Sequence, residues 1–214
     1  MRSDPGSGGQ RDLTFIEAAR RAQIVTTAID TIAEAGYGQA SLARIAERAG
    51  VSKGVISYHF AGKDDLIREI VAEVLAKGQA YMIPRLLAES SGARMLRVYI
   101  ESNLAFMREY RNHVVALFEI LLNARGEGGS RLLDEQSLDY VVTSLEQLLA
   151  HFQAVGDFRA DFDPQVMAAA IRGAIDQVPL RLARDPDLDL DRYARELAAL
   201  FDRATSREPG GPGG

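Results

Sequence analysis

Residues 41–63 of the chain read SLARIAERAGVSKGVISYHFAGK, and this stretch decides the fold. Its first apolar residues recur at the spacing of one helix face, at Leu42, Ile45, Ala46 and Ala49. Ser41 stands where it can cap that helix, and Gly50 can end it by adopting the left-handed conformation. Ser52 can then cap a second helix. The stretch therefore predicts two short helices joined by a tight turn.

The second of these helices has one apolar face and one polar face. Ile56 and Phe60 are spaced i, i+4 and are expected to face the core. The opposite face carries Gly54 and Tyr58, flanked by Val55 and Ser57, with Lys53 in the first turn. A helix in the major groove contacts bases with its N-terminal residues, while hydroxyls, amines and the helix dipole hold phosphates. The pattern is therefore typical of a helix-turn-helix that binds double-stranded DNA.

Several motifs in this stretch and just before it occur together in a known signature. They are Gly36-Tyr37, the turn Ala49-Gly50-Val51-Ser52, and Tyr58-His59-Phe60 followed three residues later by Lys63. Over about residues 20 to 67 the chain resembles the N-terminal signature of the TetR family of bacterial transcriptional regulators. The resemblance implies an N-terminal DNA-binding domain, a C-terminal domain that binds a small molecule, a homodimer and, as the usual mode, repression.

The resemblance also implies which residues touch DNA. They are Ser41, Ser52, Lys53, Gly54, Val55, Ser57, Tyr58, His59 and Lys63. The first three residues of the second helix match positions that meet base edges: Lys53 can donate to guanine, and the Val55 methyls can meet a thymine methyl. Ser41, Ser57, Tyr58, His59 and Lys63 match positions that grip phosphates. Family members often have Thr in place of Val55 and Tyr in place of Ser57, so the preferred operator stays open. His59 can equally be a packed histidine beside the turn.

The composition limits the other classes of protein. The 214 residues are 47% apolar, enough for a core, and include no cysteine, which excludes disulfides, cysteine-based zinc sites and cysteine nucleophiles. No apolar run approaches the about 20 residues that span a bilayer, and the N-terminus lacks the apolar centre of a signal peptide. The net charge is −5, yet residues 41–63 carry four cations and one acid. We therefore expect a cytoplasmic protein with no membrane partner and a small basic surface for DNA.

The rest of the chain predicts helix after helix and no strand. Apolar stripes and turn residues place helices at about 14–35, 64–80, 93–109, 111–124, 131–155, 163–183 and 189–205, which with the two above makes about nine. The expected fold class is all-α, with a three-helix DNA-binding domain at 13–63 and a helical ligand-binding and dimerisation domain at 64–205. Residues 1–12 and 206–214 are rich in Gly, Pro and polar residues and are expected to be disordered tails.

Aromatic and methionine residues on the middle helices are candidates for a ligand pocket, because the resemblance implies a small-molecule site there. The candidates are Tyr99, Phe106, Met107, Tyr110, His113, Phe118, Tyr140 and Phe152. Such a lining suits an apolar effector, although each residue can also be plain core. Arg172 and Asp176 form an i, i+4 pair that can orient a polar ligand group, but a surface or interface ion pair is the favoured account. No cofactor and no bound metal are expected.

The last two predicted helices are candidates for a dimer interface. The resemblance and the small residues along one face point to Ala170, Gly173, Ala174, Leu197, Leu200 and Phe201. Small residues would let a partner backbone come close, and two helices from each protomer would form a four-helix interface. The alternative is that both helices only cover the core of one protomer.

Other function classes find less support. The sequence has no Gly-x-Ser-x-Gly elbow, phosphate loop or His-Glu-x-x-His helix, so we expect no enzyme. Acids from Asp185 to Glu196 follow calcium-loop spacing, but Leu190 stands where such a loop turns on Gly, and helix caps explain the acids as well. A metal-binding module and a helical adaptor without DNA binding remain the alternatives.

The resemblance also suggests a mechanism of regulation. In a regulator, a ligand among the central helices would shift helix 64–80 and change the separation of two DNA-binding domains.

Overall fold

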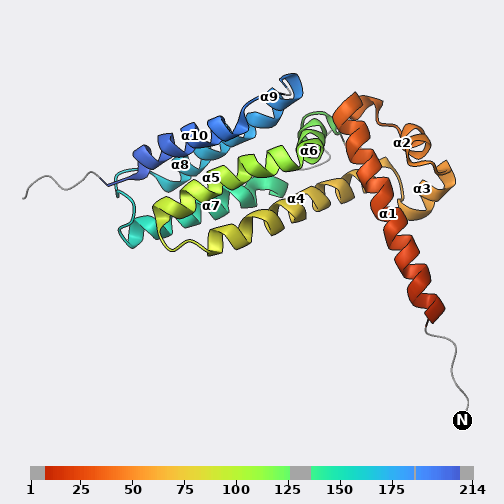
Figure 1. Cartoon of the computed structure of the whole chain (residues 1–214), viewed down its shortest axis with the longest axis horizontal. Helices are drawn as coiled ribbons and strands as arrows, with labels where there is room; N and C mark the ends of the chain where they lie inside the picture. The colour runs from red at the N-terminus through yellow and green to blue at the C-terminus, as the bar shows by residue number, and fades with distance from the viewer. Residues whose placement is uncertain (1–7, 126–135, 186, 208–214) are drawn as a thin grey trace, which may run out of the picture.

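The structure, a computed structural model, describes residues 8–125, 136–185 and 187–207, which form helices and no β-strand. The α-helices are α1 (Gly8–Ala35), α2 (Leu42–Ala49), α3 (Lys53–His59), α4 (Lys63–Leu87), α5 (Gly92–Glu109), α6 (Arg111–Asn123), α7 (Gln136–Ala154), α8 (Pro164–Asp176), α9 (Val178–Arg184) and α10 (Leu190–Thr205), and the 3-10 turn η1 (Tyr37–Gln39) follows α1. Figure 1 shows an N-terminal domain, α1 to α3, at one end of a longer bundle made of α4 to α10, the C-terminal domain. The predicted all-α class is confirmed.

The N-terminal domain is organised around the turn between α2 and α3. Ser41 Oγ accepts a hydrogen bond from the Arg44 amide (3.2 Å), and Ser52 Oγ accepts one from the Val55 amide (3.3 Å), so both predicted caps form. Gly50 ends α2 in the left-handed conformation, with φ 65° and ψ 32°. The core of this domain also includes residues of α4 and α6, so its packing is continuous with the C-terminal domain.

Helix α4 is longer than the sequence predicts. It continues past the expected end near residue 80 and runs through Pro84 to Leu87. Tyr81 and Leu86 pack against the core of the C-terminal domain, and this burial holds the last turns although proline removes one backbone hydrogen bond. As a result α4 reaches from the N-terminal domain deep into the bundle (Figure 1).

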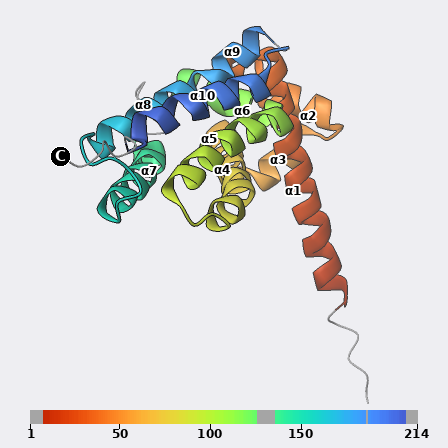
Figure 2. The same cartoon turned by 60° about the vertical axis from the view of Figure 1, so that its left-hand side comes forward.

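The bundle is built around α5. Figures 1 and 2 both show α5 between α4 on one side and α8 and α10 on the other. The single helix expected at 163–183 is wrong, because α8 ends at Asp176 and α9 begins at Val178. Pro179 explains the break, since its ring lacks an N–H and clashes with the carbonyl of the preceding turn. Helix α9 turns away from α8 and packs against α6.

The ends of the chain agree only partly with the expected tails. Helix α1 begins at Gly8, so residues 8–12 are helical rather than part of a disordered tail, while residues 1–7 and 208–214 lie outside the described residues. Residues 131–135 of the expected helix 131–155 also lie outside them. Ser206 Oγ donates to the Asp202 carbonyl (2.7 Å) and Arg207 Nη1 to the Gly156 carbonyl (2.9 Å), so the backbone just after α10 is held in place.

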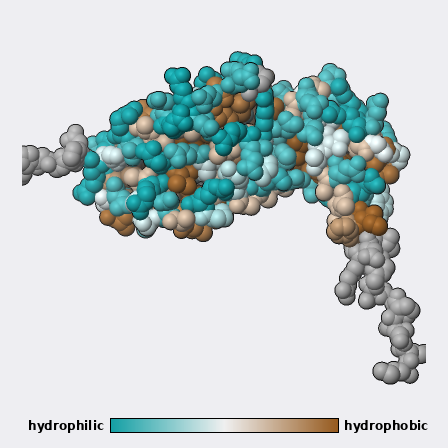
Figure 3. Space-filling model, in the orientation of Figure 1, coloured by the Kyte–Doolittle hydropathy of each residue, from teal (hydrophilic) through white to brown (hydrophobic). Residues whose placement is uncertain are grey.

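The outer surface of both domains is mainly hydrophilic on the face drawn in Figure 3, with small hydrophobic patches. The large apolar side chains gather inside, in one core of each domain. Across the parts of the chain that the structure describes, no helix combines the length and the apolar character needed to cross a bilayer.

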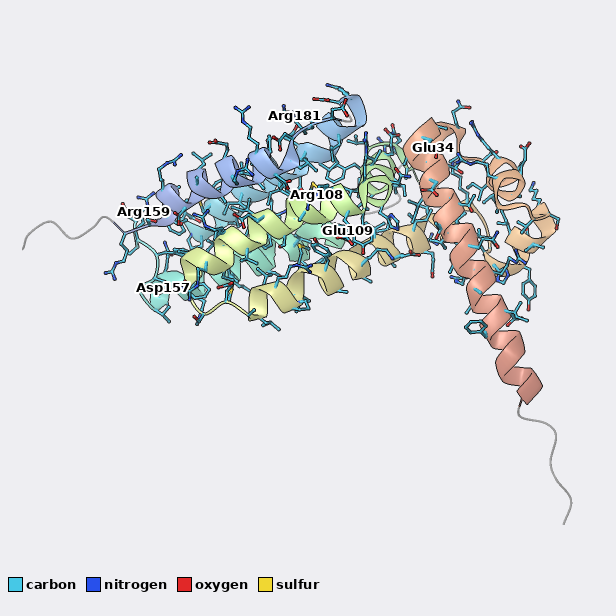
Figure 4. All side chains as sticks on the ribbon, viewed as in Figure 1. Glu34, Arg108, Glu109, Asp157, Arg159 and Arg181 are labelled. Carbon is cyan, nitrogen blue, oxygen red and sulfur yellow. The ribbon has the colours of Figure 1, made fainter. Side chains whose placement is uncertain are left out.

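Replacement by alanine should have opposite effects on stability at two helical glycines, Gly78 and Gly92. A Cβ on Gly78 would lie 3.7 Å from the Phe106 ring, an ordinary contact, and alanine favours the helix by about 0.5–1 kcal/mol. A Cβ on Gly92 would lie 2.7 Å from Phe152 Cγ, and the Gly92 amide is also held by Asp157 (2.7 Å), which Figure 4 shows at the far end of the bundle. We expect Gly92→Ala to lower the free energy of unfolding by about 1–3 kcal/mol. Urea denaturation of both variants checks the two signs; equal effects would contradict the packing described.

Candidate DNA-binding surface and ligand cavity

Helix α3 presents its polar face to solvent. Ile56 and Phe60 are buried, at 0% and 2% exposure, which turns the other side of the helix outward. Lys53, Gly54, Ser57 and Tyr58 are all exposed there. Val55 is half-buried and packs against the N-terminal core, so only part of its side chain reaches solvent. Its position next to Ile56 along the helix accounts for this, since neighbouring side chains are only about 100° apart.

Tyr58 is exposed but already hydrogen-bonded within the domain. Its hydroxyl donates to Glu17 Oε1 on α1 (2.9 Å), and this hydrogen bond raises the pKa of Tyr58. The Tyr58 ring also meets the edge of the His59 ring, with centroids 5.1 Å apart. His59 is half-buried, so its side chain is neither fully packed nor fully presented to solvent. The hydroxyl of Tyr58 would have to leave Glu17 in order to donate to a phosphate.

Arg21 holds α3 against α1 and α4. Its Nη1 donates to the His59 carbonyl at the end of α3 (2.7 Å), and its Nη2 forms an ion pair with Glu69 on α4 (2.7 Å). The guanidinium also lies over the Phe60 ring, 4.4 Å from its centroid. Sequence reasoning missed this role, because the partners are 38 and 48 residues away and no spacing links them.

Lys63 is half-buried, and its ammonium is engaged within the protein. Its Nζ donates to the Tyr37 carbonyl (3.1 Å) and lies over the Tyr37 ring, 4.0 Å from the centroid. Burial lowers the pKa of Lys63. The Tyr37 amide in turn donates to Glu119 Oε2 on α6 (3.3 Å). We call these three residues the Tyr37 junction; it joins η1 to the first turn of α4 and to α6.

A cavity of about 250 Å³ lies in the bundle among α4, α5, α6, α7 and α8. Its walls are mostly apolar, and its lining comprises Val74, Leu75, Gly78, Gln79, Met82, Asn103, Phe106, Met107, Val114, Leu117, Phe118, Leu121, Tyr140, Val141, Val142, Arg172 and Asp176. Gln79 Nε2 on α4 donates to the Tyr140 hydroxyl on α7 (3.3 Å), so two exposed side chains link these helices beside the cavity. This arrangement can enclose a small apolar molecule.

Half of the aromatic and methionine candidates reach this cavity. Phe106, Met107, Phe118 and Tyr140 line it, whereas Tyr99, Tyr110, His113 and Phe152 do not.

Packing explains why the other four candidates lie elsewhere. Tyr110 packs against Phe106 from outside the cavity, with centroids 4.9 Å apart. His113 is half-buried, and burial together with Lys77 lowers its pKa. Phe152 packs against Phe158 (5.8 Å between centroids) near Gly92, at the far end of the bundle. Tyr99 is buried behind the lining, and burial raises its pKa.

One corner of the cavity is polar. Arg172 Nη1 donates to the Tyr99 hydroxyl (3.0 Å) and to Asn103 Oδ1 (3.1 Å), and its Nη2 pairs with Asp176 Oδ1. The Arg172 side chain is 14% exposed and that of Asp176 is 39% exposed. Burial raises the pKa of Asp176, although Arg172 opposes that shift. The pair therefore lines the cavity and does not lie on the open surface, and Asn103 is a cavity residue that the sequence analysis missed.

The expected dimer residues divide into exposed and buried ones. On α8, Ala170 and Gly173 are exposed and Ala174 is half-buried. On α10, Leu200 is 51% exposed, but Leu197 and Phe201 lie in the core of their own protomer. Leu197 and Phe201 are therefore not available to a partner, because they face α5 and the interior. The exposed apolar surface of α8 also includes Val166, at 66% exposure.

The acids near residues 185–196 act as caps and ion-pair partners. Asp189 Oδ1 accepts from the Arg192 amide (2.9 Å) and caps α10, while Asp191 pairs with Arg108. Among the residues with described side chains, no three His, Asp or Glu residues are grouped so that they could hold a metal ion.

Comparisons with known proteins agree with this arrangement. Residues 24–70 match the sequence profile of the family described as bacterial regulatory proteins, tetR family. The chain is 36% identical over 89 residues to the HTH-type transcriptional regulator BetI 1 of Chromohalobacter salexigens; the match covers 41% of this chain and 44% of that regulator.

Two solved structures are similar over most of their length. One is FadR from Bacillus subtilis in complex with stearoyl-CoA, with a TM-score of 0.72, 21% identity and coverage of 84% of this chain and 96% of the other. The second is AibR in complex with isovaleryl coenzyme A and operator DNA, with a TM-score of 0.72, 19% identity and coverage of 85% and 97%. At these identities the two structures show a shared fold.

Proposed function

This chain belongs to the TetR family of bacterial regulatory proteins, and from that premise we propose that it is a homodimeric transcriptional repressor that a small molecule releases from its operator. The observation that carries the proposal is the outward face of α3, where Lys53, Gly54, Ser57 and Tyr58 are exposed on a helix fixed by the Ser52 cap and by Arg21. No core contact requires these polar residues on that face. A helix of this kind fits the major groove, with Lys53 near base edges and the hydroxyls near phosphates.

The contacts in the structure change the proposed DNA contacts at three positions, Tyr58, Lys63 and Val55. Tyr58 would exchange Glu17 for a phosphate, and Ser41 and Ser52 would contact phosphates while their hydroxyls still cap α2 and α3. Lys63 would support the DNA-binding domain through Tyr37 rather than contact DNA. Val55 would offer only the edge of its side chain to a base.

A dimer is supported by the exposed small and apolar residues of α8 and α10. Ala170, Gly173 and Leu200, with Val166, are exposed on α8 and α10 and are small or apolar. A two-fold dimer would present two copies of α3 to half-sites about one helical turn, roughly 34 Å, apart.

The effector site would be the cavity of the bundle. A ligand-responsive regulator needs a binding site for its effector, and the apolar walls of this cavity fit a small, mainly apolar molecule. FadR and AibR, which share the fold, were solved with acyl coenzyme A molecules, and AibR also with operator DNA. Location in the cytoplasm stays a prediction from the sequence.

The Tyr37 junction offers a route from cavity to DNA. Helices α4 and α6 both line the cavity, and both reach the junction, α4 through Lys63 and α6 through Glu119. A ligand that separates α4 from α6 would pull on η1, which leads directly into α2. A coupling free energy of about 1–3 kcal/mol would change operator affinity about 5–150-fold.

The function is tested by selection from a randomised duplex library with the purified protein. We expect enrichment of two-fold symmetric sites, bound by two protomers as counted by mass photometry, with affinity that falls steeply with salt. Enrichment of no sequence over the unselected library would contradict the proposal.

If the Tyr37 junction transmits ligand binding to the DNA-binding domain, Glu119→Gln should weaken this coupling without weakening ligand binding. For a compound that raises the Tm of the protein, we expect this variant to keep ligand affinity but to lose about 1 kcal/mol of coupling to the selected duplex, about fivefold. Titration of the duplex with and without the compound measures the coupling. Glu101→Gln, on α5 and paired with Arg97 at 3.8 Å, is the matched control and should couple like the wild type. Equal coupling in all three proteins would rule out the junction as the route.

A further inference from the structure

The two charged residues at the polar corner of the cavity, Arg172 and Asp176, differ in burial and in hydrogen bonding. Arg172 is the more buried of the two, and three acceptors from α5 and α8 already surround it. Asn103 is also committed, because its Nδ2 donates to the Tyr99 carbonyl (2.8 Å) while its Oδ1 accepts from Arg172. Neither residue offers its main polar group to a ligand without breaking contacts within the protein.

Asp176 lines the cavity, and Arg172 engages one of its two carboxylate oxygens. Only its Oδ1 is engaged, and among the described residues Oδ2 accepts no hydrogen bond. With 39% of its side chain exposed, it is the charged group of this corner that a bound molecule meets. A half-buried carboxylate oxygen gains most from a donor that is itself charged.

The aromatic residues that line the same cavity suit a cation. Phe106, Phe118 and Tyr140 bring aromatic rings to the lining, and such faces attract ammonium groups. A carboxylate on the ligand would be disfavoured, since it would have to displace Asp176 from Arg172 and leave the half-buried Asp176 carboxylate without its partner.

We propose that the effector is an apolar molecule with a single cationic amine, which binds Asp176 Oδ2 and lays its apolar part along the aromatic walls. The inference rests on the proposed function, because it names the class of molecule to which a ligand-responsive regulator of this shape responds. The proposal also gives Arg172 a role that involves no contact with the ligand. Its guanidinium holds the Asp176 carboxylate in place as an acceptor.

Three probes of matched shape test the charge of the ligand: 4-phenylbutylammonium, 4-phenylbutanol and 4-phenylbutanoate. We expect calorimetric titration of the full chain at pH 7.5 to give at least about tenfold tighter binding of the ammonium than of either other probe. In Asp176→Asn, which keeps the shape and an acceptor for Arg172, the ammonium and the butanol should bind within about threefold of each other, and the butanoate should gain because Arg172 has lost its anionic partner. Asp176→Glu, which keeps the charge, should retain the preference for the ammonium.

The wild-type titration decides by itself if Asp176→Asn does not fold, as judged by far-UV circular dichroism. Binding of the butanoate as tight as that of the ammonium, or an ammonium preference that survives in a folded Asp176→Asn, would overturn the proposal. Duplex binding without any probe is measured separately. A protein that binds its selected duplex but prefers the acid refutes only this inference, whereas one that prefers the ammonium but binds no duplex refutes the proposed function.

Discussion

Phe60→Ala should lower the free energy of unfolding by about 3–5 kcal/mol. Phe60 is 2% exposed and belongs to the core that unites α1, α3 and α4, so alanine leaves a cavity that the rigid helices cannot fill. The variant also removes the ring over which the Arg21 guanidinium lies, 4.4 Å from its centroid. Because the two cores share α4 and α6, we expect the loss to appear in the unfolding of the protein and not only as local fraying.

Urea denaturation followed by circular dichroism measures this loss. Tyr58→Ala is the matched control, since it removes an aromatic ring two positions away that is 73% exposed. Exposed positions of this kind usually change stability by about 0.5 kcal/mol or less. A Phe60→Ala variant as stable as Tyr58→Ala would show that α3 is not oriented as described.

Lys53→Ala should weaken binding to the selected duplex by about 1–3 kcal/mol, about 5–150-fold. Lys53 is exposed in the first turn of α3, and it makes no ion pair with any residue whose side chain is described. Its ammonium is therefore available to guanine in the major groove. The variant should keep its Tm, since no core contact is removed.

Lys77→Ala is the control for charge alone. Lys77 lies on α4 beside Glu73 (3.7 Å), away from α3, and its loss changes the net charge of the protein by the same amount. Fluorescence anisotropy with both variants separates a contact from a general electrostatic effect. If the two variants lose affinity equally, Lys53 does not touch the duplex.

Local features of the DNA-binding domain could be predicted from the sequence because they depend on neighbouring residues. Ser41, Gly50 and Ser52 act within one turn of chain, and their caps form as expected. The burial of Ile56 and Phe60 follows from helix periodicity, which also turns Tyr58 outward.

Features that depend on distant partners could not be predicted. Lys63 looks like a phosphate contact in the sequence, but its carbonyl partner lies 26 residues away, and Tyr37 is tied to Glu119 across 82 residues. Leu197 and Phe201 show why a helical stripe does not identify an interface: one apolar face fits either a partner or the core of the same protomer, and here α5 occupies it.

The cavity shows the same limit. Half-buried charged groups such as Arg172 and Asp176 carry no sequence signal beyond their i, i+4 spacing, which is equally common on exposed helices. Only the packing of α5 against α8 brings Asn103 and Tyr99 within hydrogen-bond distance of Arg172.

The most direct test of the central claim uses the absence of cysteine from the chain. A DNA-cleaving iron chelate attached to Ser57→Cys reports which base pairs lie next to the exposed face of α3. We predict cleavage of the selected duplex at two symmetric positions about one helical turn apart, and none from the same chelate on Ser144→Cys, an exposed position of α7. Equal cleavage from both positions, or none from Ser57→Cys on a duplex that is bound, would contradict the claim that α3 is the DNA-reading helix.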